Sequence, residues 1–226
     1  MNLEPKLEQV RREFLVRMTQ GDNTLLRQVE DHVTARTGKM LRPRLTLLAA
    51  ATLGDEHLDE RRTLLLATAV EMLHNASLLH DDVIDRADTR RGQPSVNARW
   101  GNATAVLVGD WLLAQIMRLL DEVDDRSATR LVNRTVIEMV EAELLQLNVE
   151  HLTQDTYLKI VDGKTARLFA TACALGNPQY ENFGLHYGRL FQMRDDIADG
   201  EAPDFVNSLI EQETQEINNL KYILSI

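Results

Sequence analysis

The sequence contains a single cysteine, five prolines and few aromatic residues among its 226 positions. Because Cys173 is alone, no internal disulfide can form, which is consistent with a reducing cytoplasm. Its place in the small-residue run ATACALG indicates a packed core thiol rather than a nucleophile. Scarce proline, the lack of low-complexity linkers and abundant helix-forming residues predict a single domain over residues 1–226.

Net positive charge and long apolar runs are also missing. A formal charge of −10 argues against a nucleic-acid partner, because phosphate backbones require a basic surface. No stretch approaches the roughly 18 consecutive apolar residues that a membrane span requires. The N-terminal residues MNLEPKLEQVRREF are charged from the start, unlike a signal peptide. We therefore expect a soluble cytoplasmic protein without a transmembrane segment.

Period-two alternation and hairpin signals are scarce, so we expect an all-α fold, a bundle of long helices. Residues 3–35 predict two amphipathic helices broken near Gly21. A basic turn at 38–44 then leads into an apolar helix that ends at Gly54. The later helices are predicted over residues 59–85, 103–120, 124–149, 153–176 and 180–200, with residues 90–102 as a turn and a last amphipathic helix within 207–224.

The stretch from Leu64 to Pro94 passes from an almost unbroken apolar helix to a charged end. Apolar residues lie nearly all the way round, which is typical of a helix buried among other helices. Asp81 and Asp85 are four residues apart, so their carboxylates share one helical face. Ionised carboxylates beside a buried segment require neutralising cations. Acidic and basic groups at one end of an apolar helix suit an anion carried by a metal.

A second cluster, Asp195, Asp196 and Asp199, repeats the D-D-x-x-D spacing of the first. One such cluster is as well explained by a solvated helix end, but two copies more than a hundred residues apart are harder to dismiss. If the two helix ends face each other, six carboxylates converge on one cavity. Oxygen ligands without His or Cys suit magnesium, which commonly bridges carboxylates to substrate phosphates.

A di-iron site in a helical bundle would require paired Glu-x-x-His motifs. Glu71 and His74 form one such motif, and no second copy occurs, so the sequence excludes this kind of site. Both residues are interpreted as polar groups on the cavity side of their helix. Lys164 lies in an apolar helical pattern, where a lysine either extends to solvent or has a buried anionic partner.

The segments GKMLRP, EMLHNASLLHDDVIDRADTRRGQP, GKTA and FQMRDDIAD, taken in this order, resemble the signature of the trans-isoprenyl diphosphate synthases, the polyprenyl synthetase family. The resemblance covers about residues 35–200. It implies an all-helical isoprenoid synthase fold around a deep central cavity, usually as a homodimer. It also implies a magnesium-dependent prenyltransferase that condenses isopentenyl diphosphate with an allylic diphosphate, head to tail.

The resemblance also implies roles for individual positions. Six aspartates would hold magnesium on the allylic diphosphate: Asp81, Asp82, Asp85, Asp195, Asp196 and Asp199. Arg90 and Lys164 would contact the allylic diphosphate, and Lys39, Arg42, His74 and Arg91 would bind the isopentenyl diphosphate. Thr165 and Gln192 match catalytic positions near the reacting carbons.

Product length follows from helical geometry. A product whose diphosphate lies at Asp81 grows past the residues one turn earlier, Ala76 and Ser77, and both are small. We therefore expect a medium or long polyprenyl product, beyond twenty carbons. The chain departs from the family after about residue 200, where its C-terminal part is unusually short. A non-catalytic or regulatory subunit, a class I terpene cyclase and a purely structural helical scaffold remain as alternatives.

Overall fold

The computed structural model describes residues 3–20, 23–35, 38–54 and 56–220. The chain divides into two compact units. Unit 1 comprises Met1–Leu47 and Asp59–Asp125, and unit 2 comprises Leu48–Leu58 and Arg126–Ile226. The two acidic clusters fall in different units, because the first belongs to unit 1 and the second to unit 2. The single domain predicted over the whole chain stays a prediction.

Unit 1 contains most of the N-terminal half of the chain. Its elements are α1 (Glu4–Met18), α2 (Thr24–Thr34), the first part of α3 (Leu41–Ala51), α4 (Glu60–Ile84), β1 (Thr89–Arg90), β2 (Gln93–Pro94), α5 (Val96–Trp100) and α6 (Asn102–Val123). The two helices predicted before residue 35 and the helix predicted over 59–85 are confirmed. The predicted basic turn is wrong in part, since Arg42, Pro43 and Arg44 already lie in the first turn of α3.

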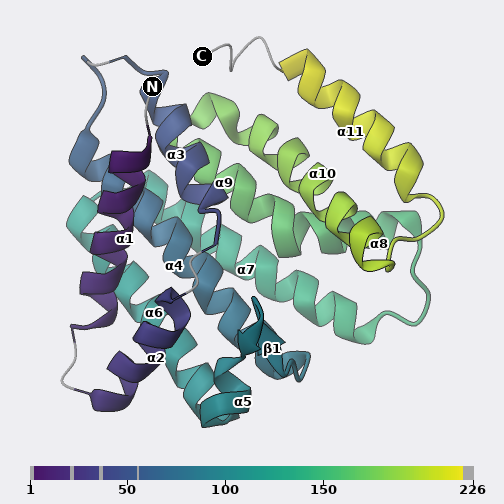
Figure 1. The fold of residues 1–226 in the computed structure, drawn as a ribbon. Coiled ribbons are helices and arrows are strands. Elements are labelled where there is room, and N and C mark those ends of the chain that lie inside the picture. The colour runs from purple at the N-terminus through teal and green to yellow at the C-terminus, as the bar shows by residue number, and fades with distance from the viewer. Residues whose placement is uncertain (1–2, 21–22, 36–37, 55, 221–226) are drawn as a thin grey trace. The chain divides into compact units, whose positions relative to one another are not determined.

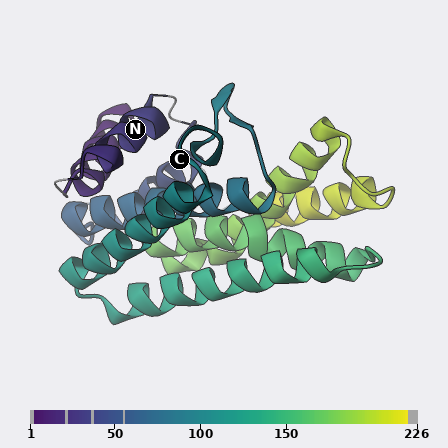
Figure 2. The ribbon, with the colours of Figure 1, turned by 90° about the horizontal axis from the view of Figure 1, so that it is seen from below.

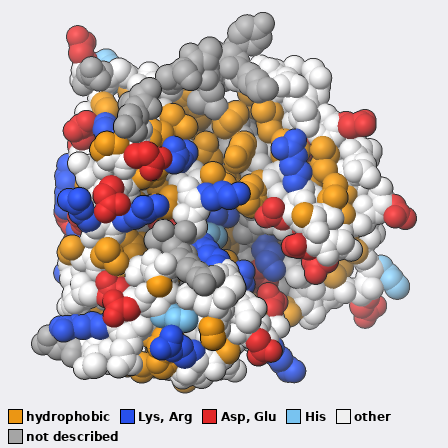
Figure 3. All heavy atoms as spheres, viewed as in Figure 1, with side chains coloured by type: hydrophobic (Ala, Val, Ile, Leu, Met, Phe, Trp, Pro, Cys, Tyr) orange, Lys and Arg blue, Asp and Glu red, His pale blue; other side chains and the backbone are white. Residues whose placement is uncertain are grey.

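The helix α4 is the core of unit 1. Asp59 caps its start by accepting a hydrogen bond from the Arg62 N–H at 2.9 Å. Its apolar side chains pack on α1 and α6, and Leu66 and Met72 are fully buried. At the start of α4, Arg61 shares Glu122 of α6 with Arg17 of α1, at 2.7 Å and 2.6 Å. Acidic and basic side chains alternate over α1 in Figure 3.

Unit 2 contains the rest of the chain. Its elements are α7 (Arg126–Asn148), α8 (Gln154–Val161), the π-helical segment η1 (Asp162–Ala166), α9 (Arg167–Gly176), the 3-10 turn η2 (Pro178–Tyr180), α10 (Glu181–Asp199) and α11 (Val206–Leu220). α9 and α10 lie side by side (Figure 1). A Cβ on Gly188 would come within 2.5 Å of the Ala166 Cα, so glycine permits this close approach. The predicted last amphipathic helix is confirmed by α11 up to Leu220, and residues 221–224 of that prediction lie outside the described residues.

Among the described residues, one helix, α6, is long and apolar enough to cross a membrane by length and composition. The core helix of a soluble protein passes the same test. Here Leu112 and Leu119 of α6 are fully buried in unit 1. This is weak evidence for a span, and the predicted absence of a transmembrane segment stays a prediction.

Candidate functional site

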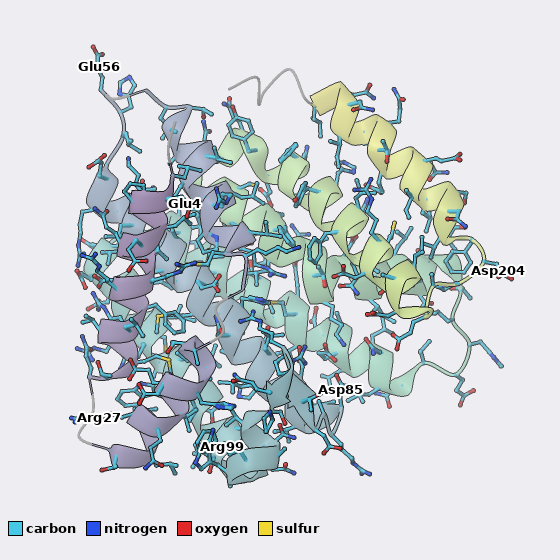
Figure 4. The ribbon with its side chains drawn as sticks, viewed as in Figure 1. Glu4, Arg27, Glu56, Asp85, Arg99 and Asp204 are labelled. Atoms are coloured by element: carbon cyan, nitrogen blue, oxygen red, sulfur yellow. The ribbon has the colours of Figure 1, made fainter. Side chains whose placement is uncertain are left out.

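The first acidic cluster closes α4, where Asp85 is the C-terminal cap. The Asp85 N–H donates to the Asp81 carbonyl at 2.8 Å, which places these two residues one turn apart. The last turn of α4 contains no basic residue. Because a helix C-terminus already carries partial negative charge, carboxylates placed there destabilise the helix unless a cation neutralises them. Figure 4 labels Asp85 at this end of the helix.

Asp82 differs from its two neighbours because it is almost completely buried. The Arg90 guanidinium donates to its Oδ1 through Nε at 2.9 Å and also through Nη2. The Asp82 carbonyl accepts from the Asn97 side chain at 3.1 Å. Asp82 therefore fixes the segment that follows α4. Of the other two aspartates in the cluster, Asp81 is half-buried and Asp85 is exposed.

The prediction of a turn over residues 90–102 is wrong in part, because this segment contains most of a short antiparallel hairpin, β1–β2, and the helix α5. The two loop residues of the hairpin, Arg91 and Gly92, have φ values of 52° and 73°, as a type I′ turn requires. Arg91 thus adopts a left-handed conformation that is uncommon for a residue with a side chain. Arg-Gly is not among the dipeptides that usually announce such a turn, which is why no hairpin was expected at this position. In Figure 2 this loop, in dark teal, rises to one side after the end of α4.

Three of the predicted basic residues, Arg42, Arg90 and Arg91, lie near His74 in unit 1. Burial, together with the positive charges of Arg42, Arg91 and Arg90, holds the pKa of His74 well below its ordinary value. One turn earlier, burial raises the pKa of Glu71, and the charge of Arg42 opposes that rise. His74 is therefore neutral in a strongly positive environment, which suits an anionic ligand. Lys39, the remaining member of the predicted set, is exposed.

A cavity of about 290 Å³ lies beside these groups within unit 1. Glu71 and Asn75 of α4 line one side, and Arg91 of the hairpin lines another. α1 and α2 supply the apolar side chains Phe14 and Val33. Of the two residues predicted on the cavity side of α4, Glu71 lines this cavity and His74 lies near the arginine side chains.

The second acidic cluster closes α10 in unit 2. The last turn of this helix also contains no basic residue, and Gly200 ends it in a left-handed conformation, with φ 76°. Asp196 accepts hydrogen bonds from the Tyr157 hydroxyl at 2.5 Å and the Gln192 amide at 2.7 Å. Asp195 and Asp199 are exposed. The second cluster thus repeats the pattern of the first, with a middle aspartate bound by protein donors between two more exposed ones.

Lys164 and Thr165 lie in η1, a π-helical turn of the kind often found at functional sites. The predicted anionic partner of Lys164 is Glu143 of α7, whose Oε1 lies 2.8 Å from Nζ, and Gln146 accepts at 3.1 Å. Thr165 donates to the Gln192 Oε1 at 2.6 Å. A Cβ on Gly163 would lie 2.6 Å from the Glu138 carbonyl, so glycine permits η1 to approach α7 closely.

No group of three or more His, Cys, Asp or Glu side chains is arranged to hold a metal within the described part of the chain. The six aspartates are divided equally between the two units, so their convergence on one cavity stays a prediction. Their chemistry fits magnesium, because all the candidate donors are carboxylate oxygens.

The sequence pattern of the polyprenyl synthetase family matches residues 23–206. The chain belongs to the polyprenyl synthetase family. A relative from Rhodobacter capsulatus, an all-trans-nonaprenyl-diphosphate synthase (geranyl-diphosphate specific), is 42% identical over 187 residues, which are 77% of this chain and 57% of the relative. The chain therefore spans less than two thirds of the length of this member of the family.

Two solved structures are similar to this chain in fold. A polyprenyl synthase from Caulobacter crescentus, complexed with calcium and isoprenyl diphosphate, is 36% identical with a TM-score of 0.81, covering 86% of this chain and 62% of that one. An isoprenoid synthase family member from Thermotoga neapolitana is 26% identical with a TM-score of 0.83, and the match covers 98% of this chain and 91% of that one. The predicted family and the all-α isoprenoid synthase fold are confirmed.

Two smaller predictions concern single side chains of this polyprenyl synthetase family member. Cys173 is buried, and burial raises the pKa of its thiol to about 12, as expected of a core thiol. Ala76 is buried, whereas Ser77 is half-buried with its hydroxyl donating to the His74 carbonyl at 2.9 Å. The role of Ala76 and Ser77 in product length stays a prediction.

The contact of Tyr157 with the second acidic cluster could not be identified from the sequence. A tyrosine on an amphipathic helix is ordinarily a core residue, and nothing in the sequence pairs it with Asp196. The structure brings them together although they are 39 positions apart.

Proposed function

We propose that this chain is a magnesium-dependent prenyltransferase that condenses isopentenyl diphosphate with an allylic diphosphate, head to tail, to make a medium or long polyprenyl diphosphate. The observation that supports the proposal is that α4 and α10 end in the same acidic pattern. Each helix closes on D-D-x-x-D with no basic residue in its last turn. This arrangement destabilises an isolated helix and suits a divalent cation. The nonaprenyl product in the name of the Rhodobacter relative supports the long product.

In this proposal the two acidic clusters hold the same allylic diphosphate through magnesium. All six aspartates are proposed ligands; Asp85, Asp195 and Asp199 are exposed, whereas Asp82 is almost completely buried and bound to Arg90. Bound magnesium supplies positive charge that stabilises the departing diphosphate. The Caulobacter relative, which was crystallised with calcium and isoprenyl diphosphate, is compatible with such a site.

The basic groups divide between the two substrates. Lys39, Arg42 and Arg91, with neutral His74 between them, bind the isopentenyl diphosphate, because guanidinium groups match phosphate oxygens in charge and geometry. Arg90 and Lys164 contact the allylic diphosphate. Lys164 must then exchange the Glu143 carboxylate for a phosphate oxygen.

Departure of the diphosphate leaves an allylic cation, which the isopentenyl double bond attacks. A proton is then lost to the released diphosphate. The side-chain dipoles of Thr165 and Gln192 lie toward this cation, and apolar walls exclude the water that would otherwise trap it as an alcohol.

The deciding experiment incubates the purified chain with magnesium, isopentenyl diphosphate and allylic primers of several lengths, and then sizes the products. We expect elongated polyprenyl diphosphates whose formation requires both isopentenyl diphosphate and magnesium. Turnover of an allylic diphosphate without isopentenyl diphosphate would instead identify a terpene cyclase. A chain that condenses nothing alone but changes the product of a partner synthase would identify a regulatory subunit.

Replacing Ser77 by phenylalanine should shorten the product. An aromatic ring one turn before Asp81 fills the path along which the growing chain would extend, so elongation stops earlier. Product chromatography of Ser77→Phe against wild type measures the change. Ser77→Ala is the matched control, because it removes the hydroxyl without adding volume and should keep the wild-type product. An unchanged product from Ser77→Phe would mean that the chain grows in another direction.

We also propose that the protein is a cytoplasmic homodimer. Large apolar side chains are exposed on α6, where Leu107 and Met117 are 67% and 68% accessible. On α7 the exposed apolar side chains recur at helical spacing: Ile137, Val140, Leu144 and Leu147. Exposed apolar side chains on one face of a helix, such as α7, favour association between subunits. Sedimentation velocity should give twice the mass of one chain.

A further inference from the structure

Tyr157 lies on α8 with only 6% of its surface accessible. Its ring meets the Phe205 ring edge-on at 5.6 Å and packs in a small core with Val161, Met193 and Leu209. The hydroxyl points out of this apolar core and donates to the Asp196 Oδ2 at 2.5 Å. The ring is therefore held by packing, and the hydroxyl has one fixed acceptor, the middle aspartate of the second acidic cluster.

The bond to Asp196 is the first in a chain of three. The other oxygen of Asp196 accepts from the Gln192 Nε2 at 2.7 Å, and the Gln192 Oε1 accepts from the Thr165 hydroxyl at 2.6 Å. An amide presents a donor on one side and an acceptor on the other. The negative charge of Asp196 therefore fixes which way the Gln192 amide faces, and this in turn fixes the Thr165 hydroxyl.

The bond between Tyr157 and Asp196 joins a hydroxyl to a carboxylate. Burial raises the pKa of Tyr157 above its ordinary value, and the hydrogen bond to Asp196 and the charge of that carboxylate raise it further. A hydrogen bond to a charged group contributes more than one between neutral groups.

We propose that Tyr157 is a positioning residue for the magnesium–diphosphate site, acting through Asp196 on the end of α10 and on Thr165 of η1. This inference rests on the proposed function. Asp195 and Asp199 share the last turns of α10 with Asp196, so an anchored Asp196 fixes the rotation of that helix end. Loss of the hydroxyl leaves the Asp196 carboxylate short of one donor, so the carboxylate and the Gln192 amide bound to it are held less firmly.

The test removes one oxygen atom by Tyr157→Phe, which keeps the ring and its packing. Isothermal titration calorimetry measures binding of magnesium pyrophosphate, and condensation assays give the magnesium concentration for half-maximal rate. We expect both to weaken by about tenfold, the effect of losing one charge-assisted hydrogen bond. Tyr187→Phe on α10 is the matched control. It removes a hydroxyl from a ring that packs against Phe169 and Phe183, and both quantities should stay at wild-type values.

A double-mutant cycle separates positioning from general stabilisation. In an Asp196→Ala background, Tyr157→Phe should have no further effect on pyrophosphate binding, because its action passes through Asp196. A lower melting temperature with unchanged magnesium pyrophosphate binding would overturn the proposal, as would additive effects in the cycle. Should Tyr157→Phe not fold, Gln192→Met breaks the same chain of bonds, and unchanged binding in that variant would also overturn it.

The binding arm also separates this inference from the proposed function. A wild-type chain that binds magnesium pyrophosphate but condenses no prenyl substrates would refute the function, while Tyr157→Phe would still be judged by its binding. A wild-type chain that binds no magnesium pyrophosphate would refute the positioning role.

Discussion

Replacing Asp81 or Asp195 by alanine should abolish condensation while leaving the helices intact. Each carboxylate belongs to the last turn or turns of its helix, at the negative end of the helix dipole. The replacement removes a proposed magnesium ligand, and we expect turnover to fall by roughly three orders of magnitude, the scale of several kcal/mol of lost transition-state stabilisation.

Lost turnover in a chain that still folds makes the experiment decisive. Circular dichroism gives the helix content, and steady-state condensation at saturating magnesium gives the rate. Asp121→Ala is the matched control, because this exposed aspartate lies in the last turn of α6, again without a basic neighbour in that turn. It should keep both its helix content and full activity. Near-normal turnover in both Asp81→Ala and Asp195→Ala would refute the metal role of the two clusters.

The helices could be predicted because local signals were strong. The expected helix over residues 59–85 is one residue longer at each end than α4. The two extra residues, Asp59 and Asp85, are the caps of the helix, and aspartate is a preferred N-cap residue. The second acidic cluster was placed at the end of a helix on spacing alone, and the contact between Gln192 and Asp196 agrees with that spacing. Local sequence left two options for Lys164, extension to solvent or an anionic partner, and the contact with Glu143 agrees with the second.

What the sequence could not reveal depends on contacts between distant residues. The segment DGKTA looks like an uninterrupted helix, and its π-helical turn occurs where Gly163 meets the backbone of α7. The hairpin is set by Arg90 reaching back to the buried Asp82, a contact that no turn propensity encodes. Tyr157 has no local signature at all. The convergence of the two acidic clusters is likewise a matter of tertiary arrangement and stays a prediction.

Lys164→Met should lower kcat/KM for the allylic diphosphate by two to three orders of magnitude, about the loss seen when one preorganised electrostatic group is removed. The variant alone is ambiguous, because Nζ also pairs with Glu143, whose side chain is only 17% exposed. Removing one partner of such a pair leaves a poorly solvated charge and destabilises the fold.

The double variant Lys164→Met/Glu143→Gln resolves this ambiguity. Neutralising Glu143 removes the unpaired charge, so the melting temperature should return toward the wild-type value, whereas the lost activity should not return. Glu143→Gln alone should stay within about tenfold of wild-type kcat/KM, because Lys164 keeps Gln146 as a partner and remains available to the diphosphate. Activity that recovers together with stability in the double variant would show that Lys164 only supports the fold. Loss that persists in a stable protein would place the lysine on the substrate, as its position within η1 beside Thr165 and Gln192 leads us to expect.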